Sequence, residues 1–257
     1  MLKKDVYLDS INYFIDYIKS EKLNKKIVAV YLGGSVGRGD YSPGRSDIDI
    51  YIVNKEEDKK LENRLMKKAY ELANTSLVEL KETCDNPFTV AVTSIESIKN
   101  GNSWLGAGCE YFSFVENSKL LLGNDIKDIL PIPNIEQIQE TSKQVLQILI
   151  SNMQEKPIIN CDNKDSITCQ VFSAIFSSIH LMLSYSGVYI RGKKEMTYSF
   201  QKLSKDNFLN SICADVFDLW NEFETNSLKD SVINKLMDDG KMFVLLGYKK
   251  FFIEHRL

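Results

Sequence analysis

The chain has 257 residues, of which 44% are hydrophobic and 26% charged, and its formal net charge is −3. This composition is typical of a folded globular protein with one large or two smaller domains. Duplex DNA binders are expected to be basic, so the charge argues against that class. No run of about 18 apolar residues predicts a membrane span. The start of the chain is charged and has no apolar segment typical of a signal peptide.

The cysteines favour a protein that works in a reducing compartment. There are five, an odd number, and no two are spaced as Cys-x-x-Cys. This spacing disfavours a zinc site or a disulfide framework. We therefore expect scattered free thiols and a cytoplasmic location.

The first third of the chain predicts strands separated by helices. Apolar residues at helical spacing predict an amphipathic helix over 5–22. Apolar runs predict a strand over 27–32 and another over 47–53. The glycine-rich turn between them is expected to open a short helix over 36–39. A helix rich in Lys and Glu follows over 55–74.

The middle of the chain continues this alternation. Three further strands are predicted over 77–82, 88–93 and 119–122. Two helices are predicted, over 94–99 with Ser94 as its N-terminal cap, and over 105–118.

Two prolines within residues 130–134 predict a stiff connector and a domain boundary. Beyond it the pattern is helical, over 135–155, 164–187, 193–204, 206–224 and 228–255. The sequence therefore predicts two domains of different class, one of mixed strands and helices over 1–130 and one all-α over 135–257.

Residues 33–49 contain the candidate phosphate-binding and metal-binding residues. The glycine turn at 33–35 ends a strand and leads into a helix, so its backbone N–H groups can bind a phosphate, and Arg38 can add a bidentate contact. Asp47 and Asp49 alternate with isoleucines, which puts both carboxylates on one face of a strand, about 7 Å apart. A divalent metal between them would relieve their repulsion. The combination predicts Mg²⁺-dependent nucleotidyl transfer.

The run Gly-Ser-Val-Gly-Arg-Gly at 34–39, followed by Ser-Asp-Ile-Asp at 46–49, resembles the signature of the DNA polymerase beta nucleotidyltransferase superfamily. The wider sequence, including residues 120–125 and the prolines after them, is similar to bacterial aminoglycoside (antibiotic) nucleotidyltransferases. The resemblance implies an α+β protein. A nucleotidyltransferase domain with a small mixed β-sheet and flanking helices would precede an all-α, acceptor-binding bundle.

The resemblance also implies an activity and a set of site residues. The enzyme would transfer a nucleoside monophosphate, such as AMP from ATP, to a hydroxyl of an aminoglycoside-like acceptor and release pyrophosphate. Asp47 and Asp49 would hold Mg²⁺, with two ions expected, and act in catalysis. The nucleotide would be bound by Gly34, Ser35, Arg38, Ser46, Lys193 and Lys194.

One position departs from the family pattern. The aminoglycoside enzymes have a third carboxylate after a Pro-hydrophobic pair, and the matching residue after Pro87 and Phe88 is Thr89. Threonine cannot take a proton from a hydroxyl at neutral pH. Glu79 on the predicted strand 77–82 is the expected substitute, with Glu82 and Glu195 as alternatives.

Several alternatives stay open. Relatives that pair this domain with a helical HEPN-type partner adenylylate that protein, as antitoxins do. Thr89 also leaves open a nucleotide-binding regulatory module without catalysis. His180 is expected in a helical core. Four aromatic residues would either line an acceptor pocket or pack in the core, namely Trp104, Tyr111, Phe112 and Phe114.

Overall fold

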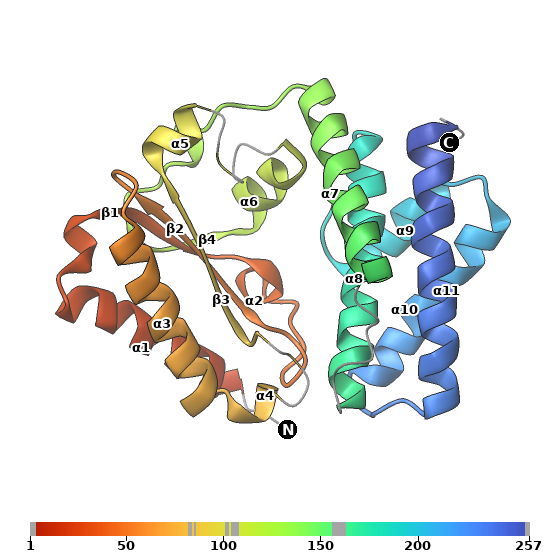
Figure 1. The fold of residues 1–257 in the computed structure, drawn as a ribbon, viewed down its shortest axis with the longest axis horizontal. Coiled ribbons are helices and arrows are strands. Elements are labelled where there is room, and N and C mark those ends of the chain that lie inside the picture. The colour runs from red at the N-terminus through yellow and green to blue at the C-terminus, as the bar shows by residue number, and fades with distance from the viewer. Residues whose placement is uncertain are drawn as a thin grey trace. The chain divides into compact units, whose positions relative to one another are not determined.

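A computed structural model describes residues 4–81, 84, 86–100, 103, 108–155 and 163–254. The chain divides into two compact units, Met1–Pro133 and Asn134–Leu257. The first contains a four-stranded sheet with helices and the second is helical (Figure 1). The predicted α+β class is confirmed.

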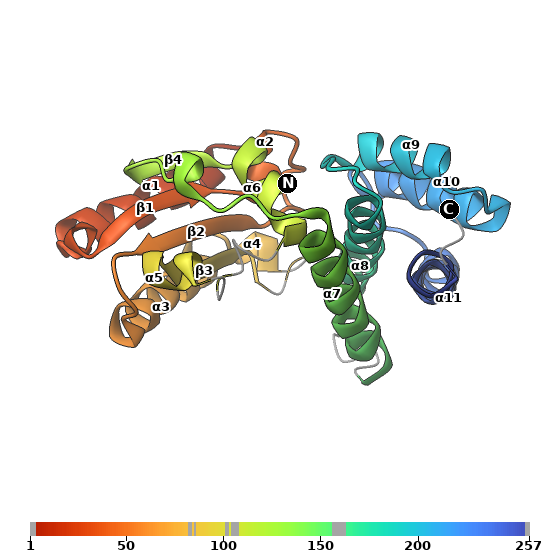
Figure 2. The same ribbon diagram turned by 90° about the horizontal axis from the view of Figure 1, so that it is seen from above.

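The sheet of the first unit is mixed. Its strands are β1 (Ile27–Leu32), β2 (Ile48–Asn54), β3 (Phe88–Ser94) and β4 (Lys119–Gly123). They lie in the order β3-β2-β1-β4, which Figure 2 shows from above. β1 is antiparallel to both β2 and β4, whereas β2 and β3 are parallel. The parallel pair needs a crossover, and helix α3 (Lys59–Thr75) supplies it.

Two hydrophobic clusters lie on the two faces of the sheet. Helices α1 (Lys4–Ser20) and α3 pack with the buried Ile48, Ile50 and Ile52 of β2 in one cluster. The other cluster joins Tyr31 of β1 to helix α6 (Tyr111–Asn117). Because strand side chains alternate, Asp49 and Tyr51 belong to the α6 side of the sheet.

The remaining helical segments of the first unit are short. They are α2 (Gly34–Arg38), α4 (Val78–Lys81), α5 (Ile95–Lys99) and the 3₁₀ turns Leu23–Lys25, Gly108–Glu110 and Lys127–Ile129. Ser94 caps α5 as expected, because its side chain accepts a hydrogen bond from the Ser97 N–H. Part of the predicted helix 105–118 lies outside the described residues.

The second unit is built around one apolar helix. Its helices are α7 (Ile135–Glu155), α8 (Lys164–Tyr185), α9 (Lys193–Leu203), α10 (Asn207–Phe223) and α11 (Asp230–Tyr248), the last followed by a π-helical turn at Lys249–Ile253. α8 contacts α7, α9 and α11. Gly240 and Gly247 of α11 face α8, where a Cβ would lie 2.7 Å from Ile175 Cδ1 or from Met182 Sδ.

Helix α8 is long and apolar enough to cross a membrane by length and composition alone, a property that the sequence analysis did not expect of any segment. Within the second unit, 67% of its most apolar window is buried. Such burial is typical of the central helix of a bundle.

One predicted strand is wrong. Residues 77–82 were expected to be extended, but Val78–Lys81 forms helix α4. Leu77 and Leu80 are both fully buried, and this spacing of three is that of a helix rather than a strand. Glu79 therefore lies on a helix and is exposed. Glu82 lies outside the described residues.

The cysteines agree with the sequence analysis as far as they are described. Cys84, Cys109, Cys169 and Cys213 form no disulfide bond, whereas Cys161 is outside the described residues. Burial raises the pKa of the Cys213 thiol to about 12.

A buried tyrosine makes stability sensitive to alkaline pH. The Tyr31 hydroxyl donates to Asp125 Oδ1 at 2.8 Å and accepts from the Ile126 N–H at 2.7 Å. Burial raises the pKa of Tyr31 above its ordinary value, and the Asp125 carboxylate adds to this. The unfolded tyrosine ionises near pH 10, so above about pH 10 the unfolded state binds fewer protons and the free energy of unfolding falls.

Tyr31→Phe is therefore expected to remove part of this alkaline loss, about 1.4 kcal/mol per pH unit above pH 10. Denaturant unfolding at pH 9, 10 and 11 measures the slope. Tyr13→Phe, an exposed tyrosine on α1, is the matched control and should leave the slope as in the original chain. Equal slopes of unfolding free energy against pH in the two variants would contradict the assignment of the alkaline loss to Tyr31.

Candidate functional site

Two glycines hold the turn between β1 and α2 against strand β2. The Gly33 N–H donates to the Asp49 carbonyl at 2.8 Å. A Cβ on Gly33 would lie 2.2 Å from the Tyr51 ring. Gly34 has a φ of 59°, and a Cβ there would lie 2.0 Å from Asp49 Oδ2. The structure thus places the Asp49 carboxylate directly against the predicted phosphate-binding turn.

Ser35 lies in the first turn of α2 and is half-buried. First-turn N–H groups have no partner within a helix, so they are available to an anion. The Ser35 carbonyl accepts from the N–H groups of Gly39 and Asp40, which closes the end of this short helix.

Arg38 does not extend freely from the turn. Its Nε donates to both carboxylate oxygens of Asp40, at 3.1 and 3.2 Å, and most of its side chain is buried. A phosphate contact by Arg38 must therefore compete with Asp40, a neighbour that the sequence analysis did not consider.

Asp47 and Asp49 flank the buried Ile48, as the alternation predicts, and both are half-buried. Strand β2 begins only at Ile48, so Asp47 belongs to the loop that precedes the strand. The position of Asp47 therefore depends on what fixes that loop.

Tyr7 of α1 holds the loop that contains Asp47 in place. The Tyr7 hydroxyl donates to the Ser46 carbonyl at 2.8 Å and accepts from the Gly44 N–H at 3.0 Å. Burial raises the pKa of Tyr7, and the negative charge of Asp47 adds to the shift. Sequence reasoning missed this residue, because nothing local pairs positions that are 39 residues apart.

Ser46 also closes the loop. Its Oγ accepts a hydrogen bond from the Ser42 N–H at 3.0 Å, and only 7% of the residue is exposed. These contacts favour a positioning role for Ser46 over the direct nucleotide contact expected from the sequence.

The neighbouring strand brings Thr89 beside Asp49. In the parallel pair of β2 and β3, Asp49 is in register with Thr89. Partners in register project to the same face, so a carboxylate at this position would stand next to Asp49. The Thr89 hydroxyl instead donates to the Asn86 carbonyl at 3.4 Å.

Glu79 does not replace the missing third carboxylate on the strand beside Asp49. Helix α4 packs through Leu80 into the cluster on the other face of the sheet from Asp49. Glu195 is exposed in the first turn of α9, in the second unit.

The two lysines predicted to bind nucleotide differ in their surroundings. Lys193 Nζ lies 3.8 Å from the centre of the Trp220 ring and 5.6 Å from that of Phe176, as in a cation–π contact. Lys194 is exposed at the start of α9.

Other highlighted residues prove to be core. His180 is 2% exposed within α8, with a ring nitrogen 3.5 Å from Ser184 Oγ. Tyr111 and Phe114 are buried against Tyr31. Phe112 is partly buried at the edge of the same cluster. Trp104 lies outside the described residues.

The donor set at Asp47 and Asp49 suits a hard divalent cation. Mg²⁺ prefers carboxylate oxygens, and it is commonly held by one or two carboxylates together with phosphate oxygens and water. In the part of the chain that the structure describes, no group of three or more His, Cys, Asp or Glu residues has the geometry of a metal site. Two carboxylates leave coordination positions of Mg²⁺ that phosphate oxygens and water can fill.

Comparison with protein families matches residues 11–88 to the nucleotidyltransferase domain family. Comparison with curated protein sequences gives no match. Among solved structures, the fold is similar to a crystal structure of spectinomycin adenyltransferase AAD(9) from Enterococcus faecialis with ATP and spectinomycin. The TM-score is 0.58 with 12% sequence identity, and the match covers 93% of this chain and 99% of that chain.

Proposed function

We propose that the protein transfers AMP from ATP to a hydroxyl of a small-molecule acceptor and releases pyrophosphate, because residues 11–88 match the nucleotidyltransferase domain family. The acceptor is an aminoglycoside-like compound. This acceptor class is supported by the fold shared with an adenyltransferase whose crystal structure holds ATP and spectinomycin.

The observation that supports the reaction most is the contact between Gly34 and Asp49. The Asp49 carboxylate occupies the space where a Gly34 side chain would be, so the proposed anion-binding turn and the proposed metal-binding carboxylate lie in contact. A triphosphate on the turn would meet a cation on the aspartates without a large rearrangement. Such preorganised charge stabilisation is the main contribution of proteins to phosphoryl transfer.

Each residue of the site has a role in the proposal. Ser35 and the first N–H groups of α2 bind triphosphate oxygens, while Asp47 and Asp49 hold Mg²⁺. When bound, Mg²⁺ neutralises phosphate charge and favours departure of pyrophosphate. Tyr7 and Ser46 keep Asp47 in place.

Of the two lysines that the sequence analysis named, Lys194 is an exposed residue, whereas the Lys193 ammonium lies over Trp220.

The test is ATP turnover with Mg²⁺ and a panel of aminoglycosides and aminocyclitols. Pyrophosphate release that requires both Mg²⁺ and one of these acceptors is expected. Transfer of the AMP label to protein, with none to small molecules, would replace the proposal with a protein-adenylylating, antitoxin-like activity. Nucleotide binding without any turnover would indicate a regulatory module.

A second candidate, nucleotide binding with impaired transfer, is favoured by Thr89. Its place beside Asp49 is where a carboxylate could accept the acceptor's proton, and general base catalysis contributes typically 10²–10⁴-fold.

If the protein binds nucleotide but transfers AMP slowly for lack of a base, Thr89→Glu should raise the transfer rate about a hundredfold. Thr89→Gln, of the same size without the charge, is the control. Single-turnover kinetics with bound ATP measure both. No gain in Thr89→Glu would mean that another group already serves as the base.

A further inference from the structure

The two edges of the sheet in the first unit differ in how they are protected. β4 forms one edge, and it has five residues, begins with Lys119 and has a register shift against β1 between Val30 and Tyr31. Short strands, lysines and irregular pairing all hinder the addition of a further strand. β3 forms the other edge (Figure 2), and its seven residues include no charged residue and no proline. Its register with β2 is unbroken, and in the residues that the structure describes no other strand pairs with its outer side.

The sequence of β3 is symmetric about Ala91, because residues 89–93 read Thr-Val-Ala-Val-Thr in both directions. If a second β3 lay antiparallel to the first with the two Ala91 residues opposite each other, every valine would face a valine and every threonine a threonine. Both valines, Val90 and Val92, pack on the α1–α3 side of the sheet. Cross-strand pairs of β-branched residues stabilise antiparallel strands. The edge is therefore complementary to itself.

An apolar surface flanks this edge on the α3 side. A cavity of about 320 Å³ opens between α3 and the first half of β3. Phe88 and Val90 of β3 line it together with Met66 and Tyr70 of α3. Met66 is 51% exposed and Tyr70 69%. Large apolar side chains that are exposed together mark interaction surfaces.

Two copies joined at β3 would bring their α3 helices into contact. α3 covers β3 and the neighbouring β2. Adjacent strands lie about 4.8 Å apart, so the two helices would be about 10 Å apart across the joined strands, which is the usual distance between packed helices. Met66 lines the cavity beside Val90, close to the level of Ala91 along the strand, and would face the same cavity of the second copy.

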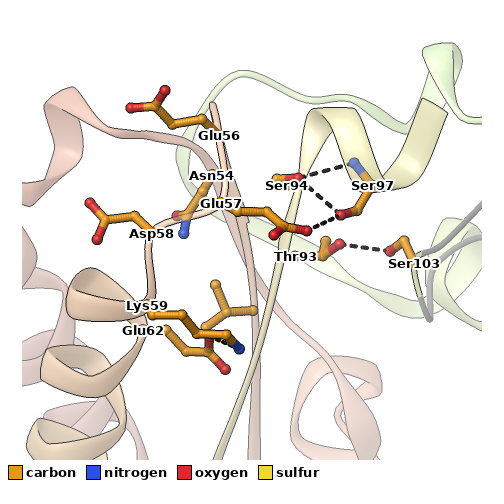
Figure 3. A pocket seen from close by; sticks show the side chains of 11 residues that line it. Asn54, Glu56, Glu57, Asp58, Lys59, Glu62, Thr93, Ser94, Ser97 and Ser103 are labelled. Atoms are coloured by element: carbon orange, nitrogen blue, oxygen red, sulfur yellow. Dashed lines mark hydrogen bonds and ion pairs between the residues drawn. The ribbon is translucent and has the colours of Figure 1, made fainter. Parts of the chain in front are cut away.

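The two ends of the edge differ in charge. Beyond Val92 a polar cavity of about 200 Å³ is lined by four carboxylates and one lysine, namely Glu56, Glu57, Asp58, Glu62 and Lys59 (Figure 3). Glu56 and Glu57 are exposed. At the other end, the charged residue that lines the apolar cavity is Lys81. Antiparallel pairing would place the acidic end of each copy at the Lys81 end of the other, and such complementary charge favours this orientation.

We propose that two copies of this chain associate through β3, antiparallel about a two-fold axis at Ala91, and form one continuous sheet with their α3 helices packed together. Identical surfaces that pair about a two-fold axis close into a dimer and leave no edge for a third copy. The pairing uses the backbone of β3 and the outer side chains of α3, so it does not depend on the proposed transfer of AMP.

Sedimentation velocity of the full chain, over about a hundredfold range of concentration, tests the association. A monomer that becomes a dimer as the concentration rises, or a dimer throughout, is expected. A chain that stays monomeric over the whole range would overturn the proposal. Open-ended assemblies larger than a dimer would overturn it too, because a two-fold pairing of β3 is closed.

Met66→Glu tests the surface without disturbing the core, because the side chain is half exposed. It places two like charges close to the axis and should weaken association about tenfold or more. Met242→Glu on α11 is the matched control, since Met242 is 54% exposed and lies in the second unit. Its association should equal that of the original chain. Weaker association in Met242→Glu than in Met66→Glu would overturn the proposal, because it would locate the interface elsewhere.

The residue on the axis allows a test of the symmetry itself. Ala91→Lys and Ala91→Glu would each place a like charge directly opposite its own copy, so each variant alone should associate about tenfold more weakly. An equal mixture of the two should associate again, because the lysine of one copy then meets the glutamate of the other. A mixture that associates no better than either variant alone would overturn the two-fold pairing. Thermal unfolding shows whether both variants fold, and the Met66 and Met242 variants decide the matter if they do not.

Discussion

Asp49→Asn is expected to lower the rate of AMP transfer about a thousandfold or more, with little change in stability. The substitution keeps the shape of the side chain and removes the charge that would hold Mg²⁺ beside the anion-binding turn. Relief of repulsion with Asp47 should leave the free energy of unfolding unchanged or slightly higher. Initial rates at saturating ATP, together with thermal unfolding without ligand, measure both effects.

The matched control is Asp16→Asn on helix α1. Asp16 is exposed, and its nearest ionic partner is Lys19 at 4.0 Å, so it makes the same change in net charge away from the site. Its transfer rate should equal that of the original chain. An Asp49→Asn variant with an unchanged transfer rate would contradict the proposed mechanism, because no other observation places a metal ligand beside the proposed phosphate-binding turn.

Gly34→Ala should abolish measurable transfer through a different cause. The new methyl group would lie 2.0 Å from Asp49 Oδ2 and must push the carboxylate away from the turn. The positive φ of 59° adds backbone strain of about 1–2 kcal/mol for any residue with a side chain. We expect both weaker ATP binding with Mg²⁺ and a lower unfolding midpoint.

Gly39→Ala separates displacement of the Asp49 carboxylate from backbone strain. Gly39 also has a positive φ, of 87°, but a Cβ there meets nothing within 4 Å. This variant should lose a similar amount of stability while its nucleotide affinity falls much less. Binding titrations with ATP and Mg²⁺ compare the pair. Equal losses of affinity would show that strain in the turn, rather than displacement of Asp49, is responsible.

The sequence predicts the local geometry of this site well and its long-range assembly poorly. Glycines at 33 and 34 and the alternation of Asp49 with Ile48 and Ile50 depend on neighbouring residues, so pattern reasoning finds them. The place of the third carboxylate, where this chain has Thr89, depends on strand pairing. That Thr89 lies beside Asp49 becomes certain only from the register of β2 and β3.

The errors share a physical origin. The short segment 77–82 was expected to be a strand although Leu77 and Leu80 are spaced as on one helical turn, and both leucines pack in the cluster on the α1–α3 side of the sheet. Tyr7 gave no signal, because its importance lies in hydrogen bonds made in the folded chain. Arg38 was expected to be free for phosphate, but Asp40 two residues later binds its guanidinium.

The connectivity of the sheet has a consequence for the order in which the site forms. β1 and β2 pair as antiparallel neighbours with only the site loop between them, so this hairpin closes with little loss of chain entropy. Pairing of β1 with β4 joins residues about 90 positions apart and must come at a higher entropic cost. We expect the glycine turn and the aspartates to come together early in folding, and the edge that β4 covers to be completed last.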